Sequence, residues 1–436
     1  MICVDTFVYT AGVTISPTLP ITNRGLITKF TLDGEKVWER RYGDSLLTTE
    51  PGGTSKKCII PTLDGNFAFA GFNRNGTASI NAFLSKCNSL NGDTLFYRTY
   101  DSDIPNTLLM AKSLIQYDDG SFLLACVEDF VDVVLIKTDQ LGNEVWRRRY
   151  GSSQVKESPA RIVRSEGNNV IVYAVASEGS CDDDTDYIKQ HWVFEIDFVG
   201  DINWEYESPE DRYLGTASIT YTANGELLVY GTETIREWLG SPLNYDCPHQ
   251  GYIAKLNSNN EVEWEQTLGN SNLTTIWSAK ELPNGNIIAV GDNRIEYLPD
   301  SAQYTGWILQ FSAVGELLWE RNLTRLYPWI GKWHHLYDLK VMEDGGFLIS
   351  GTVEDFYIPS PTAGQWGWLV RTDSLGCVSS GCDSNTTSIN SPIPEIGNLE
   401  ISPNPAKPWG WSCARCWIPP GSSRRGSSSS GPRRSA

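Results

Sequence analysis

The stretch Ile136-Lys137-Thr138-Asp139-Gln140-Leu141-Gly142-Asn143-Glu144-Val145-Trp146 contains the pattern that decides the fold. It reads as a β-strand, a tight turn with a glycine, and a second strand that carries an aromatic residue. A similar stretch runs from Phe30 to Trp38 around Gly34. The turn residue recurs at intervals of 50 to 61 residues, at Gly34, Gly92, Gly142, Gly200, Asn260, Gly315 and Gly376. Repeats of this length are typical of propellers and solenoids.

Aromatic residues recur with the turn. Six of the seven copies have one four positions after the turn residue, namely Trp38, Phe96, Trp146, Trp204, Trp264 and Trp319, and the seventh copy has Ser380 there. A ring at one fixed place in each repeat buries a large apolar area between neighbouring sheets. We therefore interpret these rings as structural.

A second hairpin precedes the first in the complete copies. Its turns are Asp-Gly or Asn-Gly pairs between apolar runs, namely Asp64-Gly65, Asp119-Gly120, Asn224-Gly225, Asn284-Gly285 and Asp344-Gly345. Such pairs are strong hairpin signals, and each copy thus supplies four antiparallel strands. The sequence predicts an all-β, seven-bladed β-propeller with blades at 1–48, 49–106, 107–154, 155–212, 213–272, 273–333 and 334–383. The first blade is expected to lack its innermost strand, because Phe7 to Gly12 matches the second strand of other copies.

Composition and charge narrow the function classes. The net charge of −18 argues against nucleic acid as a partner, because phosphate binding needs basic patches. No apolar run is long enough to span a membrane, and no signal peptide is visible at the start of the chain. The ten cysteines lack zinc-type spacing.

The composition changes after the repeats. We expect the propeller to occupy residues 1–383, followed by a Ser/Thr/Asn/Pro-rich linker at 384–398. A short segment at 399–406 precedes a tail at 407–436 that is rich in Pro, Gly, Ser and Arg. This tail is expected to be disordered, or to be translated in a shifted reading frame.

Two resemblances follow from these patterns. The repeat, with its Lys-Thr-Asp-x-x-Gly-Asn-x-x-Trp phrase at 137–146, resembles the secreted propellers of Bacteroidota and is similar to the repeats of quinoprotein (PQQ-like) propellers. The segment Ile401-Ser402-Pro403-Asn404-Pro405-Ala406 resembles the opening of the C-terminal sorting domain of the type IX secretion system. This second resemblance implies a secreted or cell-surface ancestral form that is handled by that export machinery. The resemblance stops at residue 406, so the sorting domain is expected to be truncated.

Aromatic residues crowd the long connections. In a four-stranded blade the longer links emerge on one face, which we call the loop face, and functional residues concentrate on such loops. Flat rings with polar edges suit sugars or peptides; packing of the loops themselves is the alternative. The candidate ligand-binding residues are Trp238, Tyr245, Tyr304, Tyr327, Trp329, Trp333 and Trp366.

Charged and sulfur-containing loops supply the other candidates. Asp182, Asp184 and Asp186 are spaced closely enough to hold Ca²⁺ through carboxylate oxygens, although a solvated acidic loop is the plainer interpretation. Disulfides are expected between Cys377 and Cys382 and between Cys181 and Cys247, whereas Cys58, Cys87 and Cys126 are expected to be packed thiols. His334-His335 could ligate a metal, but no third ligand is visible by spacing.

These patterns favour an exported, non-catalytic propeller that binds a glycan or a protein through its loop face, with no cofactor beyond a possible Ca²⁺ ion. The alternative is a propeller enzyme, such as a lyase, glycosidase or quinoprotein. The enzyme would need convergent polar groups in the central channel, whereas the binding module would need exposed rings on the loop face. A surface spacer without a ligand is the third interpretation.

Overall fold

Strands make up all the regular structure that is described. The structure is a computed structural model, and it describes residues 1–15, 23–43, 48–51, 58–75, 79–129, 132–151, 156–178, 188–208, 214–234, 249–269, 273–298, 301–325, 332–355, 364–378 and 399–400. These ranges contain strands β1 to β29 and no helix. None of them therefore forms a helix of the length and apolar character needed to span a bilayer.

Five separate antiparallel sheets come first along the chain. The first contains β1 (Ile2–Val4), β2 (Phe7–Ile15), β3 (Asn23–Thr31) and β4 (Lys36–Tyr42). The second contains β5 (Thr48–Pro51), β6 (Ile59–Pro61), β7 (Phe67–Asn75), β8 (Ser79–Cys87) and β9 (Thr94–Tyr100). The third contains β10 (Leu109–Gln116), β11 (Phe122–Glu128), β12 (Asp132–Thr138) and β13 (Glu144–Tyr150). The fourth contains β14 (Lys156–Arg164), β15 (Val170–Glu178), β16 (Ile188–Ile196) and β17 (Ile202–Glu207). The fifth contains β18 (Leu214–Tyr221), β19 (Leu227–Thr234), β20 (His249–Leu256) and β21 (Val262–Leu268).

The remaining strands form one sheet of eight. Its members are β22 (Thr275–Glu281), β23 (Ile287–Leu298), β24 (Ser301–Phe311), β25 (Leu317–Leu323), β26 (Lys332–Val341), β27 (Phe347–Asp355), β28 (Gly364–Thr372) and β29 (Leu399–Glu400). Two four-stranded groups are joined here because β24 and β26 pair in parallel at Tyr304 and Trp333. The short β29 pairs with β28 at Leu369 and Trp368.

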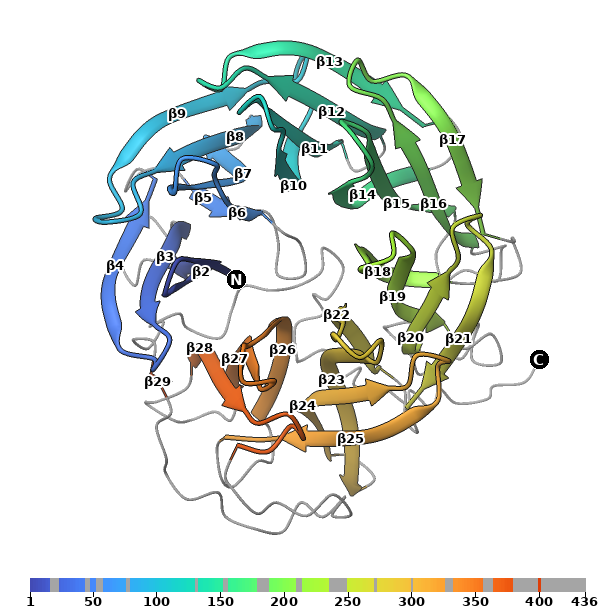
Figure 1. The fold of residues 1–436 in the computed structure, drawn as a ribbon. Helices are drawn as coiled ribbons and strands as arrows, with labels where there is room; N and C mark the ends of the chain where they lie inside the picture. Colours follow the sequence, from blue (N-terminus) through green and yellow to red (C-terminus); the bar gives the residue numbers. More distant parts are fainter. Residues whose placement is uncertain are drawn as a thin grey trace, which may run out of the picture.

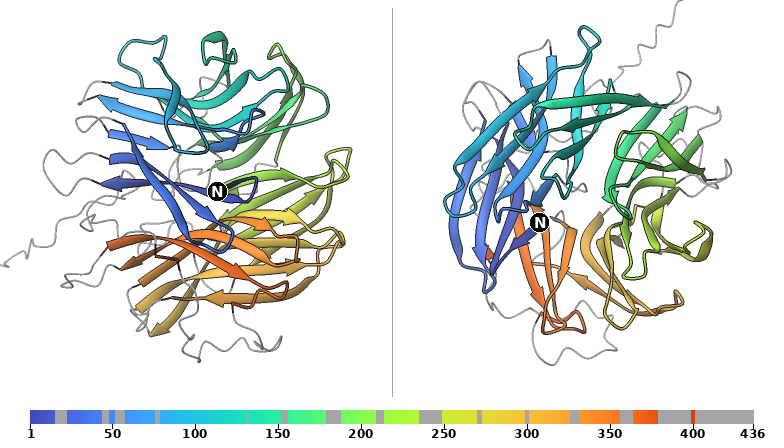
Figure 2. Two further views of the ribbon diagram at one scale, coloured as in Figure 1. Left: turned by 60° about the vertical axis from the view of Figure 1, so that its left-hand side comes forward. Right: turned by 45° about the horizontal axis from the view of Figure 1, so that its top comes forward.

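The sheets are arranged as a β-propeller, in a ring around a common axis (Figure 1; Figure 2 gives two oblique views). The predicted count of seven separate blades is wrong. The described strands form five separate blades and the broad eight-stranded sheet. The physical reason is the length of β23 and β24, which run for 12 and 11 residues and bring Tyr304 to the start of the next group.

The first blade is complete, which corrects a second expectation. Residues Ile2 to Val4 form the short innermost strand β1 and pair with Tyr9 to Phe7 of β2. In the second blade the innermost position is shared by β5 and β6, which both pair with β7.

The recurrent turn has the predicted geometry. Gly142 has a φ of 78°, and Asn260 adopts a φ of 63° in the fifth copy. Such positive φ values favour glycine and tolerate asparagine. The carboxylate of Asp139 accepts hydrogen bonds from the backbone amides of Leu141 and Asn143, both at 2.8 Å. The repeated phrase therefore works as a turn whose conformation is fixed by its own side chain.

The aromatic residues that follow each turn by four positions pack between blades, as predicted. Trp264 and Trp319 lie against the turn of the following copy. A Cβ added at Gly315 would lie 2.6 Å from the Trp264 ring, and one added at Gly376 would lie 2.9 Å from Trp319. Neighbouring blades are also joined by a hydrogen bond, because the Tyr100 hydroxyl donates to the Gly142 carbonyl at 2.7 Å.

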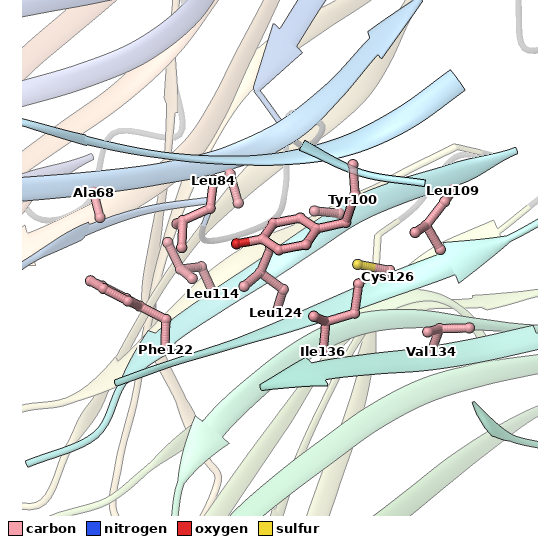
Figure 3. Packing of buried hydrophobic residues seen from close by; sticks show 13 residues of the cluster. Ala68, Leu84, Tyr100, Leu109, Leu114, Phe122, Leu124, Cys126, Val134 and Ile136 are labelled. Carbon is pink, nitrogen blue, oxygen red and sulfur yellow. The ribbon is translucent and has the colours of Figure 1, made fainter. Parts of the chain in front are cut away.

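The cores lie between adjacent sheets. Figure 3 shows the cluster between the second and third blades, where Leu84 and Tyr100 meet Leu114, Leu124 and Ile136. Comparable apolar clusters lie between the other neighbouring sheets. A further cluster lies between the two strand groups of the eight-stranded sheet. Cys58, Cys87 and Cys126 are buried thiols that form no disulfide, as predicted.

Apolar packing also closes the ring. Val8 and Phe30 of the first blade form a buried cluster with Leu348 and Leu369 of the eight-stranded sheet. Residues from the two ends of the repeat region therefore lie side by side, as Figure 1 shows for β2–β3 and β27–β28.

A β-bulge recurs in the innermost strands. The register shifts between Ala111 and Ser113, Pro159 and Arg161, Leu214 and Ala217, Ile276 and Ser278, and Leu336 and Asp338. Glycine lies beneath the last two bulges: a Cβ at Gly291 would lie 1.8 Å from the Thr275 carbonyl oxygen, and one at Gly351 would lie 1.8 Å from that of His335. Bulges redirect side chains, and these two set the positions of Trp277 and Tyr337.

Candidate functional site

The candidate site lies at the loop face of the eight-stranded sheet, where its two groups of strands join. We call it the loop-face cluster. It consists of Trp277, Asp292, Tyr304, Trp333, His335, Tyr337 and Glu354, which come from β22, β23, β24, β26 and β27. Trp277 and Trp333 lie near the starts of β22 and β26, and Glu354 lies near the end of β27. Asp292 and Tyr304 lie within the long hairpin of β23 and β24, and Tyr337 lies in the middle of β26. The parallel pairing of Tyr304 with Trp333 brings the two groups together.

A buried carboxylate organises the cluster. Asp292 has only 4% of its side chain exposed, and its Oδ1 lies 3.2 Å from Nδ1 of His335. The same oxygen accepts a hydrogen bond from the indole N–H of Trp277. Asp292 thus contacts the His335 imidazole of β26 and the Trp277 indole of β22, which belong to the two different strand groups. The contact uses Nδ1 of His335 and not Nε2.

Aromatic rings surround the histidine. The His335 and Tyr337 rings are nearly parallel, at an interplanar angle of 9° and with centroids 5.8 Å apart. Tyr304 lies 5.5 Å from the His335 ring and 5.1 Å from Trp333, centroid to centroid. Trp333 is 38% exposed, so this ring system reaches solvent at the loop face.

A second acidic side chain borders the rings. The amide of Gln365 on β28 donates a hydrogen bond of 2.5 Å to Oε1 of Glu354. On β27, Thr352 donates a hydrogen bond of 3.3 Å to the hydroxyl oxygen of Tyr337. That contact uses the phenol oxygen as an acceptor and leaves the phenol proton for donation elsewhere.

The surroundings of the cluster raise the pKa of three of its groups, His335, Tyr337 and Glu354. Burial alone would lower the pKa of His335, but the charge of Asp292 outweighs burial and raises that pKa above its ordinary 6.5. Burial raises the pKa of Tyr337 well above its ordinary value and so keeps the phenol protonated. Burial also raises the pKa of Glu354, against the opposing effects of His335 and Gln365.

This geometry is suited to proton transfer beside a binding surface. A carboxylate oxygen 3.2 Å from Nδ1 favours a proton on that nitrogen through its charge, although the two atoms do not meet hydrogen-bond geometry, and Nε2 is then the basic atom of a neutral imidazole. The stacked phenol supplies a proton donor on the same strand. The exposed ring of Trp333 and the nearby polar groups supply a surface for a ligand with both apolar faces and hydroxyl groups.

The structure brings together two of the predicted ligand-binding residues, Tyr304 and Trp333. Trp366 is on β28, where it pairs with Val353 of β27. It directly follows Gln365, so strand alternation puts the two side chains on opposite faces of the sheet. Four further candidates lie outside the described residues, namely Trp238, Tyr245, Tyr327 and Trp329.

The remaining site predictions fall mostly outside the described residues as well. Asp182, Asp184 and Asp186 lie there, as do Cys181, Cys247 and Cys382, so the Ca²⁺ site stays a prediction. Cys377 is disulfide-bonded, and its pairing with Cys382 stays a prediction. Within the described ranges no three His, Cys, Asp or Glu side chains gather as metal ligands. His334 is buried against Trp368, with Nδ1 3.1 Å from the Tyr304 carbonyl oxygen.

Sequence reasoning missed Trp277, Asp292, Tyr337 and Glu354. One signal for them was present in the repeat. The second strand of a copy ends near a glycine, and Asp292 directly follows Gly291 while Glu354 follows Gly351 by three positions. Polar residues just beyond that glycine lie where the strand reaches the loop face.

A separate cavity of about 370 Å³ lies at the opposite ends of the innermost strands. Its lining includes Ile2, Pro61, Glu281 and Lys340, which come from three sheets. It is distinct from the loop-face cluster, because its residues lie near the tight hairpins.

Comparisons with known proteins agree with this architecture. No family model matches the chain, and no curated protein matches it. Among solved structures, an ulvan lyase from a new family of polysaccharide lyases has a TM-score of 0.55 at 12% identity, over 85% of this chain and 90% of that one. A Bacteroides caccae protein of unknown function has a TM-score of 0.41 at 13% identity, over 74% of this chain and 96% of that one. The quinohemoprotein alcohol dehydrogenase of Comamonas testosteroni has a TM-score of 0.42 at 12% identity, over 74% of this chain and 59% of that one. At these identities the ulvan lyase likeness shows the fold alone, and the chain is a β-propeller.

Proposed function

We propose that this protein binds a polysaccharide chain at the loop-face cluster. The observation that carries the proposal is the contiguous ring system of Tyr304, Trp333, His335 and Tyr337 beside the carboxyl group of Glu354. Sugar rings present apolar C–H faces to aromatic rings and hydroxyl groups to carboxylates and amides. The cluster offers both kinds of contact within one surface.

A glycan fits the cluster better than a peptide does. An extended peptide commonly binds by adding a strand to an open sheet edge. At this point the edge of β24 is taken by β26, through the pairing of Tyr304 with Trp333. Side-chain rings therefore carry the recognition, which suits a sugar chain. Export to the cell surface, as the 401–406 segment suggests, would place the protein where such chains occur.

The test is a binding measurement against a panel of soluble polysaccharides, both neutral and acidic. Titration calorimetry with laminarin, xylan, alginate and polygalacturonate is expected to find at least one ligand. Trp333→Ala is expected to weaken that binding by at least ~10-fold, because one stacked ring is lost.

Tyr97→Ala is the matched control for this variant. Tyr97 has the same 38% exposure as Trp333 but lies on β9, outside the cluster. Its loss is expected to leave binding unchanged. Equal affinity in Trp333→Ala and the parent protein, or binding of a peptide library in place of every glycan, would contradict the proposal.

A further inference from the structure

The arrangement around His335 goes beyond what binding requires. A ligand-binding surface does not need a buried carboxylate that orients one nitrogen of an imidazole. Asp292 is nearly inaccessible, so it cannot contact a ligand and instead acts on His335 and Trp277. Burying a carboxylate is costly unless it is paired. The cluster therefore contains a base whose position is set by a buried carboxylate that cannot itself contact a ligand.

We propose that the loop-face cluster cleaves an acidic polysaccharide by β-elimination, with His335 as the base and Tyr337 as the acid. This inference rests on the proposed function, because the same rings hold the chain. The substrate class is a polysaccharide that contains uronate residues. Imidazole is a weak base and removes a carbon-bound proton only where a neighbouring electron-withdrawing group acidifies it, and in a polysaccharide the carboxyl group of a uronate is such a group.

The reaction balances without any further reactant. Nε2 of His335 takes the proton from the carbon beside the uronate carboxyl group. The electron pair of that C–H bond forms a double bond to the next carbon, whose bond to the glycosidic oxygen breaks. The Tyr337 hydroxyl gives its proton to the departing oxygen. The proton on His335 then returns to the phenolate, directly or through water, and no oxidation state of the enzyme changes.

The geometry favours elimination over hydrolysis. Elimination removes a proton from one carbon and delivers a proton to an oxygen on the next, so it needs base and acid side by side. The parallel rings of His335 and Tyr337, two residues apart on β26, meet this need. Hydrolysis of a glycoside ordinarily uses two accessible carboxyl groups. Asp292 is occupied and buried, which leaves Glu354 alone among the carboxyl groups of the cluster.

Two further residues suit a uronate. Glu354 lies beside the rings with its Oε1 held by Gln365, and burial raises its pKa, which lessens the repulsion between this carboxyl group and a uronate. Arg294 lies two residues beyond Asp292 in a regular part of β23, so it lies on the same face of that strand. Arg294 is expected to offset the negative charge that develops during proton removal.

The experiment separates this inference from the proposed function. The full chain is incubated with alginate, polygalacturonate and a glucuronate-containing polysaccharide, and the ultraviolet absorbance of the new double bond is followed over time. Binding of the same polysaccharides is measured in parallel with the Tyr337→Phe variant, which keeps all four rings of the cluster. We expect His335→Gln and Tyr337→Phe to lower the rate by at least ~100-fold, the size usual for a general acid or base. Tyr337→Phe keeps its ring and is expected to keep its binding, whereas His335→Gln loses a ring and is expected to bind more weakly, by far less than its loss of rate.

Asp292→Asn tests the positioning role. It is expected to keep binding, to lower the rate and to shift the acidic limb of the pH–rate profile to lower pH, because the pKa of His335 falls when its carboxylate partner is lost. His191→Gln is the control, since His191 is buried between Tyr173 and Tyr252 in other blades. Its rate is expected to match the parent.

Three results would overturn the inference. One is binding of a uronate chain without formation of a double bond. Another is an increase in reducing ends without ultraviolet absorbance, which indicates hydrolysis. The third is a parental rate in His335→Gln. Absence of binding to every polysaccharide would instead overturn the proposed function.

Discussion

At the scale of single residues, His335 links the stability of the protein to pH. The pKa of His335 is raised in the folded state by Asp292, against the effect of burial. A raised pKa means that the folded state binds the proton more tightly than the unfolded state. The resulting stabilisation is complete below the ordinary value of 6.5 and is lost as the pH rises through the folded pKa.

We expect the thermal unfolding midpoint to fall as the pH rises from about 6 to 9, and His335→Gln to flatten that fall. Glu354 also has a raised pKa, so its contribution to stability is likewise lost as the pH rises. That loss begins at a lower pH than the loss from His335, because the ordinary pKa of a glutamate is lower. Scanning calorimetry over this range measures the effect. An equal slope in the variant and the parent would show that the pairing with Asp292 does not stabilise the protein.

Gly351 is a second residue whose role can be tested singly. A Cβ there would lie 1.8 Å from the His335 carbonyl oxygen, so alanine must displace the bulged strand β26. Gly351→Ala is expected to destabilise the protein by about 1–3 kcal/mol in urea unfolding, as overpacking does. It is also expected to weaken binding at the loop-face cluster.

Gly12→Ala is the control in the same kind of strand. No atom lies within 4 Å of a Cβ at Gly12, so alanine meets no obstacle. A loss of stability in Gly12→Ala as large as that in Gly351→Ala would mean that the close approach at the bulge is not the cause.

At the scale of elements, the turn-and-aromatic phrase both closes a hairpin and joins neighbouring blades. The buried Tyr100 ring lies between the second and third blades, and its hydroxyl bonds to the Gly142 carbonyl. Tyr42 and Gly92 make the same contact one blade earlier, at 2.6 Å. The last strand of one copy is therefore attached to the turn of the next.

Tyr100→Phe removes this contact and keeps the ring. We expect a loss of about 1–3 kcal/mol in unfolding free energy, because the Gly142 carbonyl is left buried without its donor. Chemical denaturation gives the value. The control, Tyr97→Phe, removes a hydroxyl that accepts a hydrogen bond from the Asn73 amide on the exposed side of the same strand, and it is expected to cost less because water can replace that bond.

Much of this element-scale structure was predictable from sequence, because local signals dictate it. Positive-φ turns at Gly142 and Asn260 follow from short-range conformational preferences. The pairing of Tyr304 with Trp333 was not predictable, since it depends on how far β24 extends. The blade count was wrong for that reason. Asp292 and His335 are 43 residues apart in the chain, and only the joined sheet makes them neighbours.

At the scale of the whole molecule, the packing of the first blade on the eight-stranded sheet makes the ring continuous. Phe30→Ala is expected to cost about 3–5 kcal/mol, as is usual for a buried phenylalanine. Because Phe30 packs against Leu348 and Leu369, amide protection is expected to fall in β27 and β28 as well as in β2 and β3.

Phe122→Ala provides the comparison within one interior cluster. Phe122 is fully buried between the second and third blades. Hydrogen exchange in that variant is expected to rise first in β7 to β12 and to leave β27 protected. If amide protection in β27 and β28 is unchanged in Phe30→Ala, the packing of Phe30 on Leu348 and Leu369 does not stabilise the last blade.

The single parallel bridge between β24 and β26 has a consequence for how this protein could be re-engineered or could diversify. A repeat whose functional residues all lie within one blade could be duplicated or exchanged without separating them. Here the base and the carboxylate that orients it come from different modules, and the bridge fixes their distance. Anyone transplanting the site into another scaffold would have to move residues 273–378 as one cassette, and recombination that splits this cassette would separate His335 from Asp292.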